Sequence, residues 1–160
     1  MRLILAVNHE RQDLDVEPRE LLLDVLRERL GLTSVHAACE QGSCGTCTVL
    51  VDGVAIRSCL LFAIQAQGRE VRTVEDLAAD GELHPLQQAF SEHHALQCGF
   101  CTPAMLLSAL ELLEQESVPT RPEIEHTLSG NLCRCTGYTS IVDAVEAAAS
   151  SIIGGARSQG

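Results

Sequence analysis

The feature that most constrains this chain is its eight cysteines, which fall into two sets of four. The first set is Cys39, Cys44, Cys47 and Cys59, and the second is Cys98, Cys101, Cys133 and Cys135. An even number of cysteines fits a disulfide framework, but such frameworks belong to secreted domains. The apolar run Leu3–Val7 is too short for the core of a signal peptide, so we expect no export. We therefore interpret both sets as metal ligands.

The first set has the spacing C-x4-C-x2-C within the segment CEQGSCGTC (residues 39–47), and Cys59 follows a predicted hairpin. This spacing is typical of plant-type [2Fe-2S] clusters, in which four thiolates hold two irons. Gly42 and Gly45 suit such a loop, because glycine adopts positive φ readily and its N–H can approach a sulfur without a Cβ in the way. Structural zinc is the alternative, but zinc sites favour C-x2-C pairs and do not need the x4 spacing.

The second set consists of the pairs CGFC (residues 98–101) and CRC (residues 133–135). Each pair precedes a predicted helix, whose free N–H groups and positive dipole end would stabilise an anionic cluster. By spacing alone, structural zinc, a redox dithiol and buried free thiols remain alternatives for this set.

The first half of the chain predicts a small sheet with one main helix, which places the fold in the α+β class. Turn signals at Asn8–Glu10 and at Asp52-Gly53 predict two hairpins. An apolar stripe at helical spacing runs over residues 21–30 and is closed by Gly31 as a C-cap. The predicted strands are residues 3–7, 14–16, 48–51, 54–56 and 71–74, followed by a short helical stretch near 75–79.

The second half predicts four helices. The first begins at Pro85, and the second covers 103–113 with Thr102 as its cap. A capping box of Thr120 and Glu123 starts the third, and the fourth covers about 140–150 with Thr139 or Ser140 as its cap. We accordingly predict a sheet domain at residues 1–76, a helical domain at 77–153 and a flexible tail at 154–160.

The charge balance excludes one class of partner. The chain has 11 basic and 22 acidic residues, giving a formal net charge of -11. Binding to phosphate backbones needs a concentrated basic patch, so we expect no nucleic-acid partner. No apolar run approaches the roughly 18 to 20 residues of a membrane span, so we expect no membrane insertion and a cytoplasmic location.

The segments CEQGSCGTCTVLVDG, QCGFCTPAM and GNLCRCTGY, with Cys59 after the first, occur in an order that resembles the small iron-sulfur subunit of the molybdenum hydroxylases. This is the family of xanthine dehydrogenase, aldehyde oxidoreductase and carbon monoxide dehydrogenase, and the resemblance extends from about Leu3 to Ala148. It implies an N-terminal plant-type ferredoxin (β-grasp) domain followed by an all-α four-helix [2Fe-2S] domain. The implied ligands are the first cysteine set for the outer cluster and the second set for the inner cluster.

The resemblance also implies a function, namely an electron-transfer subunit of an oxidoreductase complex. In the family, a large subunit binds a molybdenum-pterin cofactor and hydroxylates an aldehyde, a purine, an N-heteroaromatic compound or carbon monoxide, with water as the oxygen source. Electrons then pass through the inner and outer clusters to FAD on a medium subunit. In separate-chain bacterial enzymes, assembled as heterotrimers or dimers of heterotrimers, the pterin is usually the cytosine dinucleotide form of molybdopterin. Gln97 and Cys135 match positions that approach the pterin in relatives.

Other residues have weaker signals. We find no nucleophile, general base or nucleotide-binding glycine motif, so we place no catalytic residue on this chain. His36 could be a cluster ligand as in Rieske centres, but four cysteines already saturate the site, so we expect a structural or surface role. His93 and His94 are expected to be exposed and not to bind metal, and Arg134 either offsets cluster charge, contacts the partner's cofactor or faces solvent. The alternative functions are a stand-alone ferredoxin and a zinc-stapled adaptor.

Overall fold

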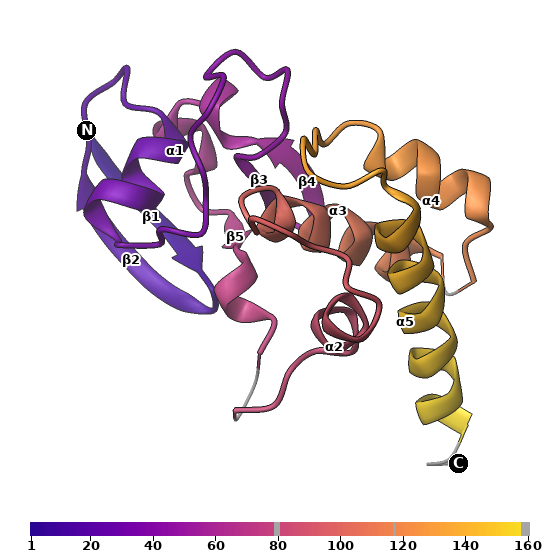
Figure 1. Ribbon diagram of the computed structural model, residues 1–160. Coiled ribbons are helices and arrows are strands. Elements are labelled where there is room, and N and C mark those ends of the chain that lie inside the picture. The colour runs from indigo at the N-terminus through magenta and orange to yellow at the C-terminus, as the bar shows by residue number, and fades with distance from the viewer. Residues whose placement is uncertain (79–80, 117, 158–160) are drawn as a thin grey trace.

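The computed structural model describes residues 1–78, 81–116 and 118–157. A β-sheet with short helical turns forms one end of the molecule and four longer helices form the other, with the termini at opposite ends (Figure 1). The two halves meet where helix α3 (Thr102–Gln115) packs against strands β3 (Thr48–Val51) and β4 (Val54–Arg57). The predicted division into a sheet half and a helical half is therefore visible as two layers of structure in contact.

The sheet has five strands in the order β2-β1-β5-β3-β4. Strand β1 (Arg2–Val7) pairs antiparallel with β2 (Glu10–Asp15) and parallel with β5 (Glu70–Arg72), which pairs antiparallel with β3. Leu3, Leu5 and Val7 alternate with less buried residues and face the core. A slip of one residue would turn all three to solvent, so this alternation fixes the register of β1.

Two-residue turns connect both hairpins. Asn8 and His9 have φ of 50° and 67°, and Asp52 and Gly53 have φ of 50° and 81°. Positive φ at both central residues is the geometry of type I′ turns, whose twist matches that of paired strands. Because the first turn needs only two residues, β2 begins at Glu10 instead of at the predicted residue 14.

The predicted helix over residues 21–30 is present as two joined parts. Helix α1 (Leu22–Asp24) continues into a π-helical turn, η1 (Val25–Arg29), in which the Leu30 N–H donates to the Val25 carbonyl at 3.1 Å. The C-cap is Leu30, one residue before the predicted Gly31, which follows it at φ 70° as the left-handed residue that ends the segment. The buried residues on its inner face are Leu22, Leu23, Val25 and Leu26. Short 3₁₀ turns are η2 (Ser58–Leu60), η3 (Ala63–Ala66) and η4 (Val74–Asp76).

The helical half contains α2 (Pro85–Glu92), α3, α4 (Arg121–Leu128) and α5 (Thr139–Arg157). The capping box of α4 is confirmed, since Glu123 Oε2 accepts from the Thr120 N–H at 2.6 Å. Two predicted caps are wrong. Helix α3 already includes Thr102, with Cys101 at its N-cap, because a proline in the first turn disrupts no intrahelical bond. Helix α5 likewise includes Thr139 and Ser140 and follows Tyr138, whose φ is 67°.

The structure differs from the predicted flexible tail at residues 154–157, because helix α5 continues to Arg157. Once a helix has formed, each added residue gains a hydrogen bond at little further cost, and nothing between residues 154 and 157 is a proline. Residues 158–160 lie outside the described residues, as do Ala79 and Asp80 of the predicted domain junction.

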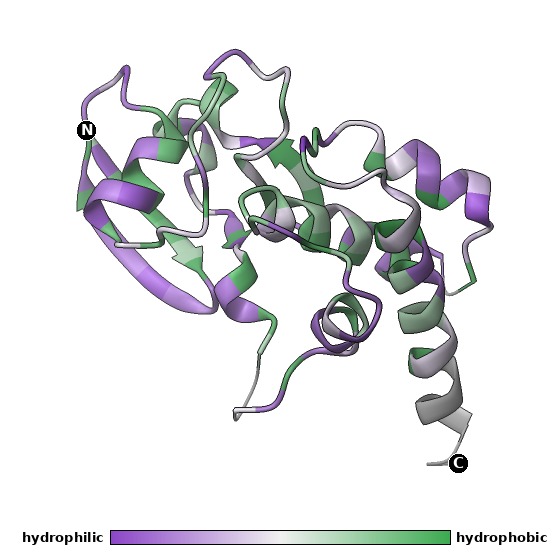
Figure 2. Cartoon of the chain, viewed as in Figure 1, coloured by the Kyte–Doolittle hydropathy of each residue, from purple (hydrophilic) through white to green (hydrophobic). Residues whose placement is uncertain are grey.

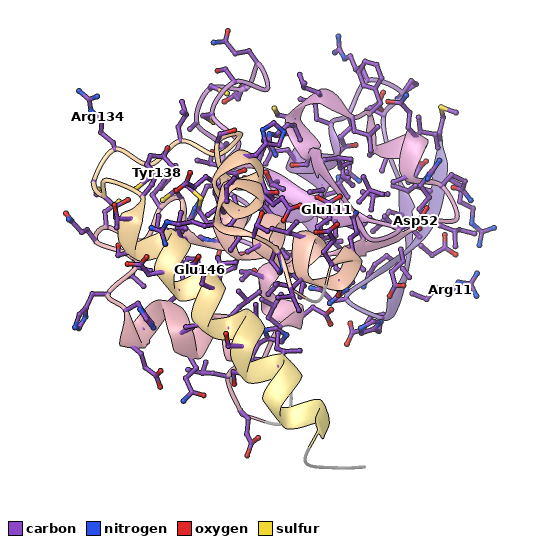
Figure 3. All side chains as sticks on the ribbon, turned by 90° about the vertical axis from the view of Figure 1, so that its right-hand side faces the viewer. Arg11, Asp52, Glu111, Arg134, Tyr138 and Glu146 are labelled. Carbon is purple, nitrogen blue, oxygen red and sulfur yellow. The ribbon has the colours of Figure 1, made fainter. Side chains whose placement is uncertain are left out.

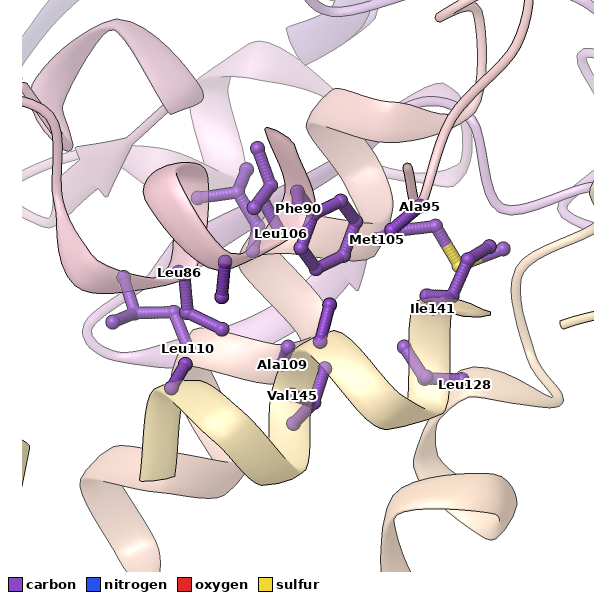
Figure 4. Close-up of a cluster of buried hydrophobic side chains, with 14 of the residues drawn as sticks. Leu86, Phe90, Ala95, Met105, Leu106, Ala109, Leu110, Leu128, Ile141 and Val145 are labelled. Carbon is purple, nitrogen blue, oxygen red and sulfur yellow. The ribbon is translucent and has the colours of Figure 1, made fainter. Parts of the chain in front are cut away.

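Two groups of buried apolar side chains form the interior. One lies between the sheet and the α1–η1 segment, and the other lies among α2, α3, α4 and α5. Figure 2 shows the apolar residues concentrated in α3 and polar residues along β2 and α4. In the helical group, Phe90, Met105 and Ile141 come from three different helices and point toward one another (Figure 4). No helix in the described part of the chain is long and apolar enough to cross a membrane.

Candidate metal centres

The first cysteine set is assembled by a loop and a hairpin. Cys39, Cys44 and Cys47 lie on the loop that leads into β3, and Cys59 lies in the η2 turn after β4. The hairpin brings Cys59 back to Cys47, because both the N–H and the hydroxyl of Ser58 donate to the Cys47 carbonyl, at 3.2 and 2.7 Å. The two thiols are neighbours. The hairpin therefore brings the fourth cysteine back to the loop, as predicted.

Backbone N–H groups point at the sulfurs of this set. The Cys44 N–H donates to Cys39 Sγ at 3.3 Å. The Ser43 hydroxyl, followed by the backbone N–H groups of Gln41 and Cys44, lowers the pKa of the Cys39 thiol to about 6. Burial, with the neighbouring Cys47 thiol, raises the pKa of Cys59 to about 11. The loop thus favours a thiolate at its outer edge, and the buried side depends on a bound cation to deprotonate its thiol.

Gly42 and Gly45 have the positive φ expected of them, at 79° and 78°. A Cβ on Gly42 would meet the end of the Leu60 side chain at 2.5 Å. A Cβ on Gly45 would meet the backbone carbonyl oxygen of Gly130 at 2.5 Å. Since Gly130 belongs to the other half of the molecule, Gly45 also allows the two halves to approach.

The second cysteine set joins two interhelical loops. Cys98 and Cys101 lie between α2 and α3, and Cys133 and Cys135 lie between α4 and α5. The Cys135 thiol lies 3.4 Å from Cys98 Sγ, and the Cys101 thiol has the Cys133 thiol as a neighbour. Burial raises the pKa of Cys101 to about 12, whereas the Phe100 N–H lowers the pKa of Cys98. All four thiols predicted from the sequence therefore converge in two pairs.

Cys133 is held by residues that follow it. The Thr136 N–H and hydroxyl both donate to Cys133 Sγ, at 3.4 and 3.1 Å. Burial raises the pKa of Cys133, but these two bonds, together with the Cys135 N–H and the Cys101 thiol, lower it more, so the net shift is downward. The Tyr138 hydroxyl accepts from the Cys133 N–H at 2.8 Å, and Figure 3 shows Tyr138 beside this loop.

The sulfurs of both sets gather in pairs. In residues 1–78, 81–116 and 118–157, no three His, Cys, Asp or Glu side chains converge on one point as ligands of a single ion would. Pairs suit a two-iron cluster, in which four thiolates are shared between two irons. The donor set and the N–H groups aimed at Cys39 and Cys133 also suit an anionic cluster.

The surroundings of the two sets differ in exposure. Cys47 and Cys59 are buried, whereas Cys98 and Cys135 are exposed. Large apolar side chains are exposed around the second set, namely Leu96 (41 %), Phe100 (44 %) and Leu132 (56 %). Gln97 is exposed beside Cys98, and Arg134 points away from the protein (Figure 3). His93 and His94 are exposed, as expected.

The two cysteine sets are connected by direct contacts between the halves. The Leu132 N–H donates to the Cys44 carbonyl at 2.8 Å, and Leu132 is the neighbour of Cys133. The His36 ring stacks on Phe100, with centroids 4.3 Å apart and planes 9° apart, and its Nδ1 lies 2.7 Å from the Phe100 carbonyl oxygen. His36 therefore has the structural role expected for it, as a brace between the two cysteine loops.

Sequence reasoning missed several residues of this region. Asn131, Thr136 and Tyr138 stand in the segment GNLCRCTGY, of which only the two cysteines and Arg134 were considered for a role. The available signal in the sequence was the polar Asn131, which directly precedes Leu132 and the two cysteines. The hydrogen-bond partners of the Asn131 side chain come from the first cysteine loop, β3 and α3, and no local pattern connects these elements to Asn131.

Comparisons with known proteins agree with this arrangement. Residues 5–73 match the 2Fe-2S iron-sulfur cluster binding domain family, and residues 73–146 match the [2Fe-2S] binding domain family. The chain therefore has two [2Fe-2S] binding domains, as predicted from the two cysteine sets.

Individual relatives match over almost the whole chain. The nicotine 6-hydroxylase small subunit of Paenarthrobacter nicotinovorans is 57% identical over 88% of this chain and 85% of its own length. The xanthine dehydrogenase iron-sulfur-binding subunit of Escherichia coli O157:H7 is 48% identical over 88% and 89%.

A solved structure gives the same result for the fold. Quinoline 2-oxidoreductase from Pseudomonas putida 86 contains a chain that superposes with a TM-score of 0.92 at 48% identity, covering 97% of both chains. The predicted α+β fold, a ferredoxin-like sheet domain followed by four helices, is confirmed. The chain belongs to the small [2Fe-2S] subunits of the molybdenum hydroxylase family, the iron-sulfur electron-transfer subunits of oxidoreductase complexes.

Proposed function

We propose that this chain relays single electrons in a fixed order, from a molybdenum-pterin site on a large partner subunit to FAD on a medium partner subunit. The second cysteine set receives the electron and the first set passes it on. The proposed ligands are Cys98, Cys101, Cys133 and Cys135 for the inner cluster and Cys39, Cys44, Cys47 and Cys59 for the outer cluster. A [2Fe-2S] cluster in each set would supply one-electron redox chemistry.

The observation that carries this proposal is the short connection between the two sets. Cys133 is covalently bonded to Leu132, whose N–H donates to the carbonyl of Cys44. A path from one ligand to the other therefore crosses a single hydrogen bond. Two clusters held by these residues would be close enough, and connected rigidly enough, for electrons to move between them without a mobile carrier.

Surface exposure supports the order of the relay. The second set opens to the surface among exposed apolar side chains, which is typical of the centre of a protein interface. We assign this face to the large subunit, with Gln97 and Cys135 toward the pterin, in the cytosine dinucleotide form. Leu60 (62 % exposed) and Phe62 (45 %) flank Cys59 on the other half. We assign that face to the FAD subunit.

The chain's own residues would tune and protect the clusters. The N–H groups of Cys44 and Thr136 donate to thiolate sulfurs, which stabilises the more negative, reduced state. Cys47, Cys59 and Cys101 lie at 9 % exposure or less, so one side of each set is closed to water. We infer a heterotrimer or a dimer of heterotrimers in the cytoplasm, a reducing compartment in which cysteines serve as metal ligands more often than in disulfides.

Replacement of one inner ligand tests the relay. The wild-type complex should contain about four irons in this chain and show two distinct EPR signals when reduced. Cys101→Ser should lose the inner signal, keep the outer one, and abolish electron transfer from substrate to FAD. Cys59→Ser should lose the outer signal, keep the inner one, and also stop FAD reduction. Normal turnover in either variant, or zinc in place of iron, would contradict the proposal.

The relatives also favour a class of substrate for the complex. The names of the three relatives above contain nicotine, xanthine and quinoline, which are all ring compounds with nitrogen in the ring. We infer that the partner large subunit hydroxylates an N-heteroaromatic compound. The purified complex should reduce a dye acceptor with such compounds and not with simple aldehydes. Preference for aldehydes would contradict this inference and leave the relay intact.

A further inference from the structure

Asn131 lies where the two halves of the molecule touch. It stands two residues before Cys133 and is 1 % exposed. Its Nδ2 donates to the Gly45 carbonyl at 3.2 Å and to Thr48 Oγ1 at 3.4 Å. Its Oδ1 accepts from the Ser108 hydroxyl at 3.1 Å. One side-chain amide therefore joins the first cysteine loop, strand β3 and helix α3.

The contact around this amide is close and polar. Arg57 donates to Thr48 Oγ1 at 2.5 Å and to the Gly130 carbonyl at 2.7 Å. The Thr48 hydroxyl donates to the Gly45 carbonyl at 2.5 Å. Every buried polar side-chain atom in the described residues has a partner, so this network is fully satisfied. A satisfied buried network holds one geometry, because any shift leaves a polar group unpaired.

The backbone of Asn131 acts on the other side, toward the second cysteine set. Its carbonyl accepts from the Tyr138 hydroxyl at 2.9 Å, and that hydroxyl accepts from the Cys133 N–H. The next residue, Leu132, makes the bond to the Cys44 carbonyl. Asn131 therefore determines the position of both ends of the connection between Cys44 and Cys133.

We propose that Asn131 is a positioning residue for electron transfer between the two cysteine sets. Its side chain holds the loop that carries Cys133 against the loop that carries Cys44, and so maintains the Leu132 bond. This inference rests on the proposed relay, and it assigns the coupling between the clusters to a residue that binds neither of them. Its loss should weaken communication between the clusters without removing either cluster.

The test compares three variants of the full-length chain in its complex. Asn131→Ala removes the amide, and Thr48→Val removes one of its partners on the other half while keeping the side-chain shape. Ser129→Ala is the matched control, since Ser129 lies on the same loop but its hydroxyl donates to the His126 carbonyl of α4. The readouts are iron content, the spin–spin splitting in the EPR spectrum of the fully reduced protein, and the rate of electron transfer between clusters.

Asn131→Ala should keep both clusters, lose the spin–spin splitting expected for the wild type, and slow inter-cluster transfer about tenfold, because such steps depend steeply on geometry. Thr48→Val should reduce the splitting and the transfer rate by less than Asn131→Ala does, and Ser129→Ala should match the wild type in both. If Asn131→Ala does not fold, the splitting and transfer rate of Thr48→Val test the proposal instead. Unchanged splitting and rate in these variants, or equal changes in Ser129→Ala, would overturn the role of Asn131 alone. Fewer than two clusters in the wild type would instead overturn the relay, and this role with it.

Discussion

At Gly45, an added Cβ would lie 2.5 Å from the carbonyl oxygen of Gly130 and 3.0 Å from the Cα of Asn131. Both contacts are with backbone atoms of the other half of the molecule, so neither neighbour can move aside on its own. Gly53 has nearly the same φ, 81° against 78°, but its Cβ would meet nothing within 4 Å. A comparison of substitutions at the two glycines therefore separates the free-energy cost of a strained backbone from that of a steric clash.

We predict that Gly53→Ala lowers the free energy of unfolding by about 1 kcal/mol, and that Gly45→Ala lowers it by about 3 kcal/mol. Only the second should also reduce the iron content, because only it separates the two cysteine loops. Chemical denaturation and iron analysis of the two variants check this. Equal losses in both would show that backbone strain, and not the contact with Gly130, is what Gly45 avoids.

The positive φ of Gly42 and Gly45 could be predicted from the sequence, since the cysteine spacing requires a tightly wrapped loop. The contact between Gly45 and Gly130 could not. These residues are far apart in the chain, and nothing in either segment indicates the other.

Helix α2 begins at a cap that depends on pH. His84 Nδ1 accepts from the Leu86 N–H at 3.2 Å, so this nitrogen must carry no proton. Burial lowers the pKa of His84 below its ordinary 6.5, and the nearby Arg72 lowers it further against an opposing effect of Glu114. Because the folded state favours the neutral ring, the cap stabilises the fold fully above pH 6.5 and less as the pH falls through the folded pKa.

His84→Asn should remove this pH dependence, because asparagine caps a helix well and does not titrate in this range. Between about pH 7.5 and about pH 5.5, the wild type should lose about 1 kcal/mol more unfolding free energy than the variant. Denaturation followed by circular dichroism at both pH values measures the difference. The same pH dependence in both proteins would mean that His84 is not the titrating cap.

Element ends were the least predictable feature at this scale. The capping box of α4 could be predicted because its two partners are within four residues of each other in the chain, and the structure confirms it. Helices α3 and α5 instead begin next to the cysteine loops, where the geometry of Cys101 and Tyr138 sets the first turn. Local capping preferences therefore do not decide where these two helices start.

The two halves of the molecule share their interior along β3. Val49 and Leu50 are neighbours and both fully buried, but they face opposite sides of the sheet. Val49 packs with the sheet core, whereas Leu50 packs with the core of the helical half. Glu111 of α3, labelled in Figure 3, accepts from the Ala55 N–H of β4 at 3.0 Å. The helical half is therefore built onto the sheet.

Leu50→Ala should consequently weaken the helical half, lowering its stability by about 2 to 5 kcal/mol, and speed hydrogen exchange in α3. Val49→Ala, its neighbour, should speed exchange in the sheet and leave α3 less affected. Hydrogen exchange followed by mass spectrometry compares the two variants. Unchanged protection of α3 in Leu50→Ala would mean that the halves are only weakly coupled.

The sequence alone was enough to predict the two cysteine sets, the order of sheet and helices, the two hairpin turns and the family. These features depend on spacing and periodicity over short segments, and such patterns are written directly in the chain. How the two sets are joined depends on the packing of the two halves, through the contact of Gly45 with Gly130, the stack of His36 on Phe100, and the buried amide of Asn131. The first two contacts, and the bond from the Asn131 amide to Gly45, join residues more than sixty positions apart, and such pairs become neighbours only when the two halves pack together.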